Sequence, residues 1–426
     1  MAYLDRSVSP VVKDFEDYRL LPPEKRESAN GILSFYFQND QLDLLHFTLL
    51  VKGGKNYEKT KCVAEMCYNV LKEHRKGETS ADFAALVDGF GASFRMNVYM
   101  ESVYINMIVP KRNAAGFLNI IFNLLLNPTF EKNDIDIYKI KKIKDLQYNQ
   151  LKVDVRAFQL LFNTFFEKGT PTQTIISEEL VNKVSEKQLI DFYNESFCAE
   201  NITFFAAGNI DDDLKQLINN LLEKIPHNKK IEPVSEISHS KVARKIYERR
   251  EESVQSAVVL CRRLFDVNPQ LERELDVLTT LFGNYFGSRL MQNLREKNGY
   301  TYGISCESSR FGKEMLFYIN GEVNAENCGK AIEECYNEMR RMRTEPVGEE
   351  ELQIVRNYMQ GRLLRSIDGV TAYMKYYCSC FQKGLDETEF YRSREAIRNI
   401  SSDRIMELSD ELFNIDDFTE IVVGQK

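Results

Sequence analysis

Short apolar segments alternate with longer segments of helical periodicity along the chain. Residues 46–51 (HFTLLV) form a compact apolar run of the kind that β-strands show. Residues 90–94 and 98–109 predict further strands after a glycine-bearing turn, and residues 114–126 (AAGFLNIIFNLLL) predict a long amphipathic helix. Residues 59–72 predict an earlier helix, because one face of it carries Val63, Met66, Cys67, Val70 and Leu71.

The second half of the chain repeats this order. A strand-like run at residues 256–261 (SAVVLC) precedes a helical pattern at 271–286, strands at 298–304 and 315–323, and a helix at 328–342. Between the halves lies a charged, proline-bearing stretch. We therefore predict an internal duplication of an α+β unit, with domains at residues 1–225 and 241–426 joined by a linker at 226–240.

The composition narrows the function classes. Hydrophobic residues make up 43% of the chain and charged residues 28%, which is typical of a folded globular protein. The net charge is −8, whereas proteins held on nucleic acid by phosphate contacts usually carry a basic excess. No apolar run reaches the length of about eighteen residues that a membrane span needs. Residues 1–21 show neither a signal-peptide nor a transit-peptide pattern, so we expect a cytoplasmic protein without a membrane or nucleic-acid partner.

The nine cysteines are scattered and include no CxxC pair. We interpret them as reduced thiols packed as small hydrophobic side chains. The sequence contains no GxGxxG, P-loop, GxSxG or DxDxDG motif either. Nucleotide binding, serine-hydrolase chemistry and EF-hand calcium binding therefore have no support.

A helix-to-strand corner at residues 289–304 (RLMQNLREKNGYTYGI) carries the most informative chemistry. We expect the helix to end near residues 295–297, Gly299 to stop it, and a strand to begin at Tyr300. Arg295 and Tyr302 then lie on either side of the corner, where they can converge on one ligand. A guanidinium fork and a phenol hydroxyl suit a peptide carbonyl or its tetrahedral oxyanion. Taken without their context, the two are read first as a surface arginine and a half-buried strand tyrosine.

Read as a whole, GSRLMQNLREKNGYTYGIS resembles the signature in the second half of the M16 metallopeptidases. NGILSFYF, LLVKGGKNYE, SADFAALVDGFGASF and FFEKGTPTQTIISEELVNKVSEKQLIDFYNESF resemble further segments of that family in the same order, so the resemblance covers residues 28–425. It implies two homologous α+β domains, each an antiparallel-rich sheet covered by helices, as in M16 and LuxS-like metalloenzymes. It also implies pairing of subunits around a peptide-holding chamber.

The catalytic motif of that family, HxxEH, is absent. In HxxEH two histidines on one helix face bind zinc and the glutamate acts as general base. Alignment of CVAEMCYNVL places Glu65 and Asn69 at the histidine positions and Tyr68 at the glutamate position. The third ligand of the family falls on Asp145, 76 residues after Asn69. An asparagine amide is a poor zinc ligand and a phenol is a poor base at neutral pH, so we expect no metal here. The one alternative is a hard cation held with waters by Glu65 and Asp145.

The four histidines offer no replacement for the motif. Glu73-His74 imitates the end of HxxEH, but the first ligand would be Val70 and the third Gln150. We expect His74 to be solvated within the polar run KEHRKGETS, His46 to lie in a strand, and His227 and His239 to lie in the linker. Gly283 and Gly287 resemble a reduced form of the glycine-bearing loop in non-catalytic M16 subunits, or form a packing turn.

The resemblance implies a non-catalytic subunit of a heterodimeric M16-type zinc peptidase. A partner subunit would carry HxxEH and the zinc, peptides would be the substrates, and Arg295 and Tyr302 would reach the partner's site. Loss of the first-half motif beside an intact corner fits such a division of labour. Two alternatives stay open: a metal-free homodimer that binds peptides or acts as a scaffold without proteolysis, and a peptidase with an unorthodox metal site.

Overall fold

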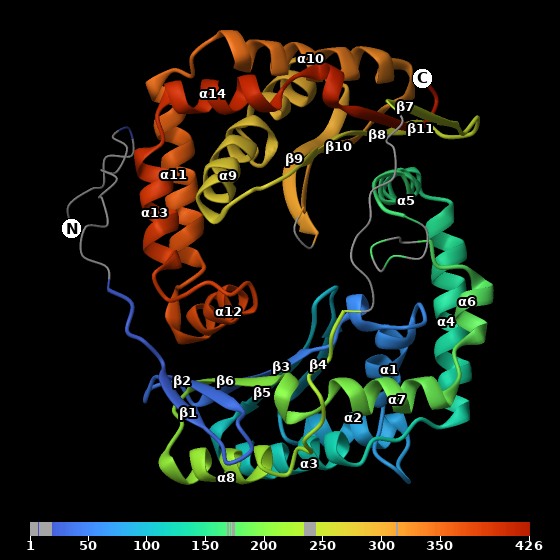
Figure 1. Ribbon diagram of the computed structural model, residues 1–426, viewed down its shortest axis with the longest axis vertical. Helices are drawn as coiled ribbons and strands as arrows, with labels where there is room; N and C mark the ends of the chain where they lie inside the picture. Colours follow the sequence, from blue (N-terminus) through green and yellow to red (C-terminus); the bar gives the residue numbers. More distant parts are fainter. Residues whose placement is uncertain are drawn as a thin grey trace.

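The computed structural model describes residues 7, 19–167, 170, 172, 175–233, 244–311 and 314–426. These residues form two β-sheets, each surrounded by helices, at opposite ends of the molecule (Figure 1). The first sheet has the strand order β1-β2-β6-β3-β5-β4 and the second β7-β11-β8-β10-β9. The predicted α+β class is therefore confirmed.

The strands of each sheet come from one half of the chain. The first sheet consists of β1 (Glu24–Glu27), β2 (Leu33–Gln38), β3 (Leu44–Lys52), β4 (Ser93–Val98), β5 (Ser102–Pro110) and β6 (Ile202–Gly208). The second sheet consists of β7 (Lys245–Arg249), β8 (Gln255–Leu264), β9 (Thr301–Phe311), β10 (Glu314–Asn324) and β11 (Thr419–Gly424).

Five α-helices lie between β5 and β6 and five between β10 and β11, whereas α8, which follows β6, has no counterpart among the described residues of the second half. Those of the first half are α1 (Val63–Leu71), α2 (Ser80–Gly89), α3 (Ala114–Leu126), α4 (Lys132–Gln150), α5 (Val153–Phe165), α6 (Glu178–Lys183), α7 (Glu186–Ser196) and α8 (Asp212–Leu222). Those of the second half are α9 (Pro269–Gly283), α10 (Cys328–Thr344), α11 (Glu349–Arg365), α12 (Gly369–Gln382), α13 (Glu389–Asn399) and α14 (Ser402–Leu412).

The two sheets share one topology once β1 is set aside. β2 pairs parallel with β6, and β7 pairs parallel with β11. The other neighbours, β6-β3-β5-β4 and β11-β8-β10-β9, pair antiparallel. Matching strand order, direction and helix order is the structural form of the internal duplication. The predicted linker, residues 226–240, falls between α8 and β7, and residues 234–240, with His239, lie outside the described residues.

The central strands are buried on both faces, which explains their continuous apolar sequences. On β3, Phe47, Leu49 and Val51 belong to the main core of the first half, whereas Leu50 faces a second apolar cluster on the other side of the sheet. On β8, Val258 and Leu260 likewise face the core of the second half. Each sheet therefore needs helices on both of its faces.

Each half supplies a helix that covers the face of the other half's sheet turned toward it (Figure 1). Leu161 and Phe165 of α5 pack with Val259 of β8 and Ile421 of β11. Reciprocally, α12 packs on β2 and β6, where Tyr373, Met374 and Cys378 meet phenylalanines of the first sheet. Since α5 and α12 hold equivalent places in the two halves, this exchange follows the internal duplication and ties the halves into one body.

Several predicted elements match the structure, and others have different bounds. The helix predicted at 114–126 is α3, and His46 lies in β3 as expected. The helix predicted at 59–72 begins only at Val63, because Cys62 has a left-handed backbone (φ 71°) and the buried Glu58 carboxylate accepts hydrogen bonds from the amides of Cys62 and Ala64. The strand predicted at 98–109 divides into the end of β4 and β5, with a turn at residues 99–101.

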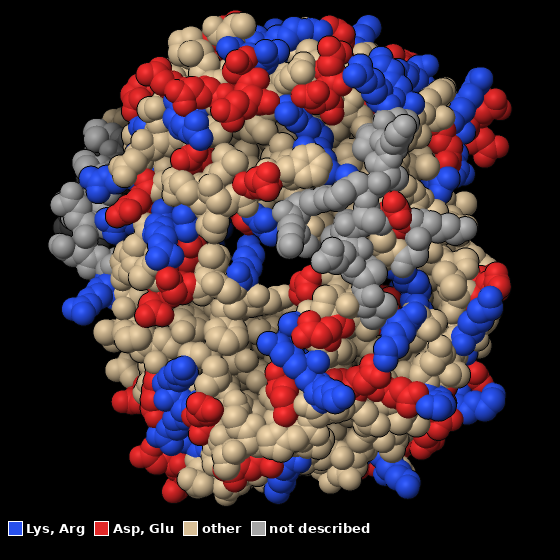
Figure 2. Space-filling view, in the orientation of Figure 1, with Lys and Arg blue, Asp and Glu red and all other residues tan. Residues whose placement is uncertain are grey.

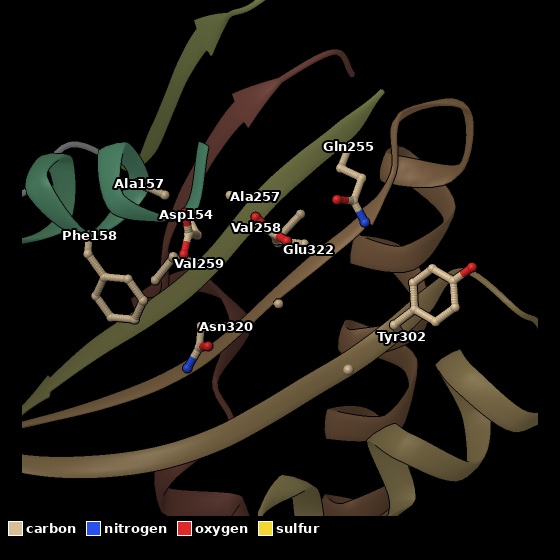
Figure 3. Close-up of a pocket in the computed structure, with 12 residues that line it drawn as sticks. Asp154, Ala157, Phe158, Gln255, Ala257, Val258, Val259, Tyr302, Asn320 and Glu322 are labelled. Atoms are coloured by element: carbon tan, nitrogen blue, oxygen red, sulfur yellow. The ribbon is translucent and has the colours of Figure 1, made fainter. Parts of the chain in front are cut away.

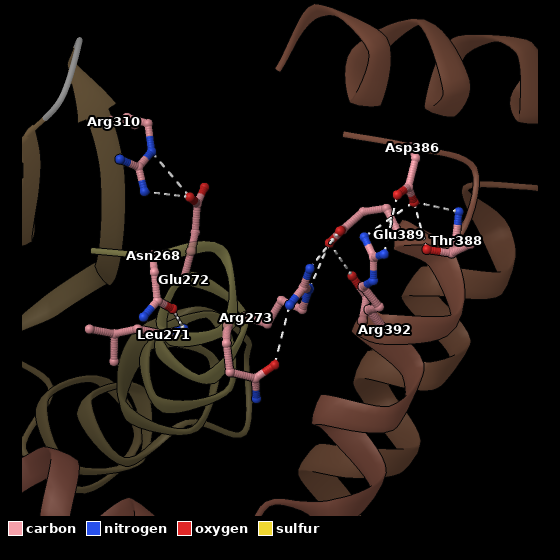
Figure 4. A network of polar contacts seen from close by, with 11 residues as sticks. Asn268, Leu271, Glu272, Arg273, Arg310, Asp386, Thr388, Glu389 and Arg392 are labelled. Atoms are coloured by element: carbon pink, nitrogen blue, oxygen red, sulfur yellow. Dashed lines mark hydrogen bonds and ion pairs between the residues drawn. The ribbon is translucent and has the colours of Figure 1, made fainter. Parts of the chain in front are cut away.

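A polar network fixes α9, the helix that precedes the predicted Arg295 corner (Figure 4). Asn268 caps its first turn by accepting a hydrogen bond from the Leu271 amide at 2.9 Å. Arg273 then donates two hydrogen bonds, of 2.8 and 2.7 Å, to the carboxylate of Glu389 on α13. Both side chains of this bidentate pair are largely buried, so the pair holds α9 and α13 in fixed register.

The face shown in Figure 2 is hollowed near its centre, between the two halves. Basic and acidic side chains are interspersed around this hollow, and neither sign dominates the face. In the described part of the chain, none of the helices has both the length and the apolar character that crossing a bilayer requires.

Candidate functional site

Three of the positions aligned with the metal motif lie on α1, and the fourth lies on α4. Glu65 and Asn69 stand one helical turn apart, and the Asn69 amide donates to the Glu65 carbonyl at 2.8 Å. Asp145 is exposed on α4, which packs against α1. The fold thus brings the two helices together as the alignment requires, but the side chains on them have other partners.

Glu65 is surrounded by donors. Its carboxylate lies 2.6 Å from Nζ of Lys142 and 3.2 Å from Nζ of Lys55, and it accepts a hydrogen bond of 3.2 Å from the Tyr138 hydroxyl. Burial by itself would raise the pKa of this carboxyl, but the charges of Lys55 and Lys142 outweigh burial and lower the pKa to about 2. Two ammonium groups therefore pair with the carboxylate that the alignment places at the first ligand position.

Gly54 allows the loop that carries Lys55 to pack closely against the turn between β4 and β5. A Cβ on Gly54 would collide with the backbone carbonyls of Tyr99 and Met100, so only glycine allows this close approach. The Lys55 amide donates to the Tyr99 carbonyl at 2.9 Å, which fixes the loop on the turn between β4 and β5. Lys55 is consequently held beside α1 by the sheet itself.

Tyr68 is fully buried and has no access to a substrate. Its hydroxyl lies 2.9 Å from Oγ of Ser196, and its ring packs 5.9 Å from the ring of Tyr193. Burial raises the pKa of Tyr68 far above its ordinary value. The position of the family's general base is therefore a structural contact between α1 and α7.

The residues present do not fit a zinc ion. Glu65 is neutralised by two lysines, the Asn69 side-chain oxygen accepts from Nζ of Lys72 at 2.7 Å, and Tyr68 points into the core. A zinc ion would have to displace these partners and lie beside two positive charges. The same two lysines disfavour the alternative of a hard cation on Glu65 and Asp145.

The expectation that His74 is solvated is wrong. His74 is 7% exposed, and its Nδ1 lies 2.9 Å from the Arg75 carbonyl while its Nε2 lies 2.7 Å from a carboxylate oxygen of Asp134. Burial opposes the charged ring, but the Arg75 carbonyl and Asp134 outweigh it and raise the pKa of His74. The polar neighbours along the chain gave no sign of this burial, because Asp134 comes from the start of α4.

Among the described residues, His74, Glu131 and Asp134 form one group whose ligand atoms lie within 4.8 Å of one another. Both ring nitrogens of His74 are engaged, and the carboxylates lie at the N-terminus of α4, where the helix dipole already favours negative charge. We interpret this group as an ion pair that fastens the α1–α2 connection to α4.

The predicted Arg295 corner is formed as expected. A π-helix ends at Lys297, and Gly299 follows it with a φ of +65°, which is favourable for glycine. The Tyr300 amide donates to the Leu294 carbonyl at 2.8 Å. The guanidinium carbon of Arg295 lies 4.9 Å from the ring centre of Phe286, and its Nε lies 3.4 Å from Glu296. The face of the Phe286 ring thus helps to orient the Arg295 guanidinium.

Tyr302 is 82% exposed and lines a cavity of about 520 Å³ (Figure 3). The cavity lies between β8, β9 and β10 of the second sheet and the start of α5, so both halves contribute to it. Its polar lining residues are Asp154, Gln255, Tyr302, Asn320 and Glu322. Burial, and to a lesser extent Asp154, raises the pKa of Glu322. Arg295 is not among the lining residues, so its convergence with Tyr302 on one ligand stays a prediction.

The sequence analysis did not identify the charged residues around Glu65 or in the cavity beside Tyr302. Lys142 lies three residues before Asp145 on α4, and that spacing was a usable signal that a cation faces α1. Lys55 and Asp154 gave no comparable signal, because their neighbours in space come from distant segments.

Comparisons with known proteins agree with this geometry. Residues 183–359 match the family model described as "Peptidase M16 inactive domain". An "Uncharacterized zinc protease" of Rickettsia felis is 21% identical over 400 residues, which cover 90% of this chain and 93% of that protein. The "Non-peptidase homolog YmxG" of Helicobacter pylori is 24% identical and covers 70% of each chain.

The chain is also similar in sequence to a subunit of a processing peptidase and in fold to a crystal structure. The beta subunit of the mitochondrial-processing peptidase of Dictyostelium discoideum is 25% identical over 183 residues, 42% of this chain and 39% of that one. The crystal structure of a peptidase M16 inactive domain from Pseudomonas fluorescens superposes with a TM-score of 0.85 at 16% identity, covering 95% of this chain and 99% of that chain. The M16 resemblance is therefore confirmed over residues 183–359, which match the inactive domain of that family. The cytoplasmic location of this chain stays a prediction.

Proposed function

We propose that this M16-type chain is the non-catalytic subunit of a heterodimeric zinc peptidase. The partner subunit would hold HxxEH, the zinc ion and the general base. This chain would supply Arg295 and Tyr302 to the substrate bound at the partner's site. The observation that carries the proposal is the contrast between the two halves: Tyr68 is fully buried at the position of the base, whereas Tyr302 is 82% exposed at the mouth of a cavity.

The substrates would be peptides or unfolded segments that add as an extended strand to a sheet edge. β9, which carries Tyr302, is the edge strand of the second sheet and pairs with β10 on one side only among the described strands. An added strand gains main-chain hydrogen bonds along such an edge. Tyr302 and Arg295 would then donate to the scissile carbonyl as its oxygen gains charge.

The similarity to a mitochondrial-processing peptidase subunit supports a paired arrangement. The name of the Helicobacter relative, a non-peptidase homolog, favours the rival function, a metal-free homodimer that binds peptides or acts as a scaffold. The two functions require complexes of different composition. The first requires a second, zinc-bearing chain in the complex, and the second excludes such a chain.

Co-purification of the tagged chain from its native cell tests the proposal. We expect an equimolar HxxEH-bearing chain, with zinc and peptidase activity in the complex alone. In that complex, Arg295→Ala and Tyr302→Phe should lower turnover by about 10²–10³ if the two groups stabilise the oxyanion. Tyr247→Phe and Arg249→Ala on β7 alter exposed side chains on the opposite edge of the same sheet and should leave turnover unchanged. A zinc-free homodimer without such a partner would refute the proposal.

A further inference from the structure

Phe286 is an exposed phenylalanine in the turn between α9 and the π-helix Met291–Lys297. It is 59% exposed, so burial in the core does not explain its position. The centre of its ring lies 4.9 Å from the guanidinium carbon of Arg295. That distance is within the range of about 6 Å over which a guanidinium is attracted to an aromatic face. The exposed ring is therefore placed against Arg295.

The turn that carries Phe286 is fixed by close packing. A Cβ on Gly283 would lie 2.6 Å from the amide nitrogen of Cys306 on β9, and a Cβ on Gly287 would lie 2.7 Å from the Tyr285 ring. Because a real Cβ does not approach other atoms so closely, a side chain at either position would displace the turn. Both glycines therefore serve to pack the turn tightly against its neighbours.

Helix α11 holds this segment from one side. Tyr285 stacks on Tyr358 of α11, with the ring centres 5.0 Å apart and an angle of 31° between the rings. Arg289 donates two hydrogen bonds of 2.9 Å to the carboxylate of Glu351, seven residues earlier on the same helix. Seven residues are about two helical turns, so Glu351 and Tyr358 lie on one face of α11. The helix thus fixes the backbone on both sides of Phe286.

The ion pair of Arg295 holds its side chain weakly. Its Nε lies 3.4 Å from an oxygen of the neighbouring Glu296, and the two side chains are 38% and 45% exposed. Exposed pairs of this kind contribute little. The Phe286 ring contacts the guanidinium through its face instead, and such stacking uses none of the N–H donors at the end of the arginine. The ring can thus orient Arg295 and leave those donors available to a substrate carbonyl.

We propose that Phe286 is a positioning residue, which holds the Arg295 guanidinium in the orientation that the peptide carbonyl requires at the partner's site. The inference rests on the proposed function, which gives Arg295 its task there. Because the ring restricts Arg295 before the substrate binds, less side-chain freedom is lost in the transition state. Phe286 acts through Arg295 and not on the substrate, so its replacement should lower kcat and change KM little.

The orientation of Arg295 is measured on the purified chain without any partner. In the chain labelled with isotopic arginine, the Nε–H signal of Arg295 in the NMR spectrum is the signal that Arg295→Ala removes. Phe286→Leu should move this signal to the position of exposed arginines, because the ring that shields it is gone. Phe286→Tyr keeps the ring and should leave the signal in place. A signal that Phe286→Leu does not move would refute the inference, whatever the complex does.

Turnover is measured in the complex with the HxxEH-bearing chain. Phe286→Leu should lower kcat about three- to thirtyfold, the range that a cation–π contact supplies, and keep KM within about twofold. Phe286→Tyr should rescue most of the turnover. Tyr247→Leu removes an exposed ring from β7, at the opposite edge of the same sheet, and should leave kcat unchanged.

A double variant separates positioning from a merely structural role. Added to Arg295→Ala, Phe286→Leu should lower turnover no further, because its effect passes through Arg295 alone. A turn that collapses without the ring would lower turnover in both backgrounds, and that result would overturn the inference.

The outcomes keep this inference apart from the proposed function. If Arg295→Ala slows turnover and Phe286→Leu does not, the inference is wrong while the proposed function stands. If Arg295→Ala leaves turnover unchanged, or if no HxxEH-bearing chain co-purifies, the proposed function fails. The role of Phe286 in the reaction then fails with it, even where the NMR signal of Arg295 responds to the loss of the ring.

Discussion

The Nζ atom of Lys142 lies 2.6 Å from Oε1 of Glu65, so an ammonium group of α4 pairs with a carboxylate of α1. These helices carry the metal ligands in the family that the chain resembles. In this chain the contact between them is an ion pair, and Lys55 adds a second positive charge to the same carboxylate. The Glu65 carboxylate therefore has two cationic partners, and no metal ion is needed to balance its charge.

The pair makes stability depend on acidity in a defined window. The folded chain holds the Glu65 pKa at about 2 against an ordinary value of 4.5. Its contribution is therefore complete above about pH 5 and is lost as the pH falls toward 2. Glu65→Gln should lower the free energy of unfolding at pH 7 by about 3 kcal/mol at most. Urea unfolding of both proteins from about pH 7 down to about pH 3.5 should show this gap closing.

Two further variants locate the effect. Lys142→Met leaves the buried carboxylate with one ammonium and should cost about 1–3 kcal/mol at pH 7. Combined with Glu65→Gln it should cost less than the sum of the two single changes, because each removes the same contact. Asp145→Asn, which alters an exposed carboxylate on the same helix, is the control. A pH-independent gap for Glu65→Gln would contradict the argument.

His74 predicts the opposite pH dependence. The Asp134 carboxylate and the Arg75 carbonyl raise its pKa in the folded chain above the ordinary value of 6.5, despite burial. A raised pKa stabilises the fold fully below about pH 6.5 and loses that contribution as the pH rises through the folded pKa. We therefore expect His74→Gln to destabilise the chain clearly at about pH 5.5 and less at about pH 8.5.

Urea unfolding at both values measures this difference. Equal destabilisation by His74→Gln at both pH values would mean that packing, and not the charged pair, makes His74 important.

The sequence predicted the elements whose signals are local. The apolar face of residues 114–126 and the glycine at 299 determine α3 and the end of the Arg295 helix through neighbours within one or two turns. The environment of Glu65 is different, because Lys55, Tyr138 and Lys142 come from two separate segments that only the packed fold brings together.

The exchange of α5 and α12 shows the same limit. An amphipathic helix such as α5 reveals in its sequence that one face is buried, but not which sheet covers it. Leu161 packs on strands about a hundred residues or more further along the chain, and Asp154, Ala157 and Phe158 of the same helix line the cavity beside Tyr302. The sequence failed to predict that His74 is buried for the same reason, because its partner Asp134 lies 60 positions further along the chain.

Restoring the family motif should fail to restore metal binding while the lysines remain. The triple variant Glu65→His, Tyr68→Glu and Asn69→His supplies two imidazoles on one helix face, and Asp145 supplies a third ligand, as in open zinc sites. Zinc would then lie beside the ammonium groups of Lys55 and Lys142, whose repulsion is strong in a partly buried site. We expect below about 0.1 zinc per chain in the triple variant, and about 1 once both lysines are also replaced by methionine.

Metal content after dialysis against a zinc buffer measures this outcome, with circular dichroism as the check on folding. The two lysine replacements alone, without the histidines, are the matched control and should bind no zinc, because Glu65 and Asn69 remain poor ligands for it. If the triple variant takes up one zinc per chain with both lysines in place, the ammonium groups are not what excludes the metal. The exclusion would then rest on the missing imidazoles alone, and the Lys142–Glu65 pair would be a consequence of their loss with no part in it.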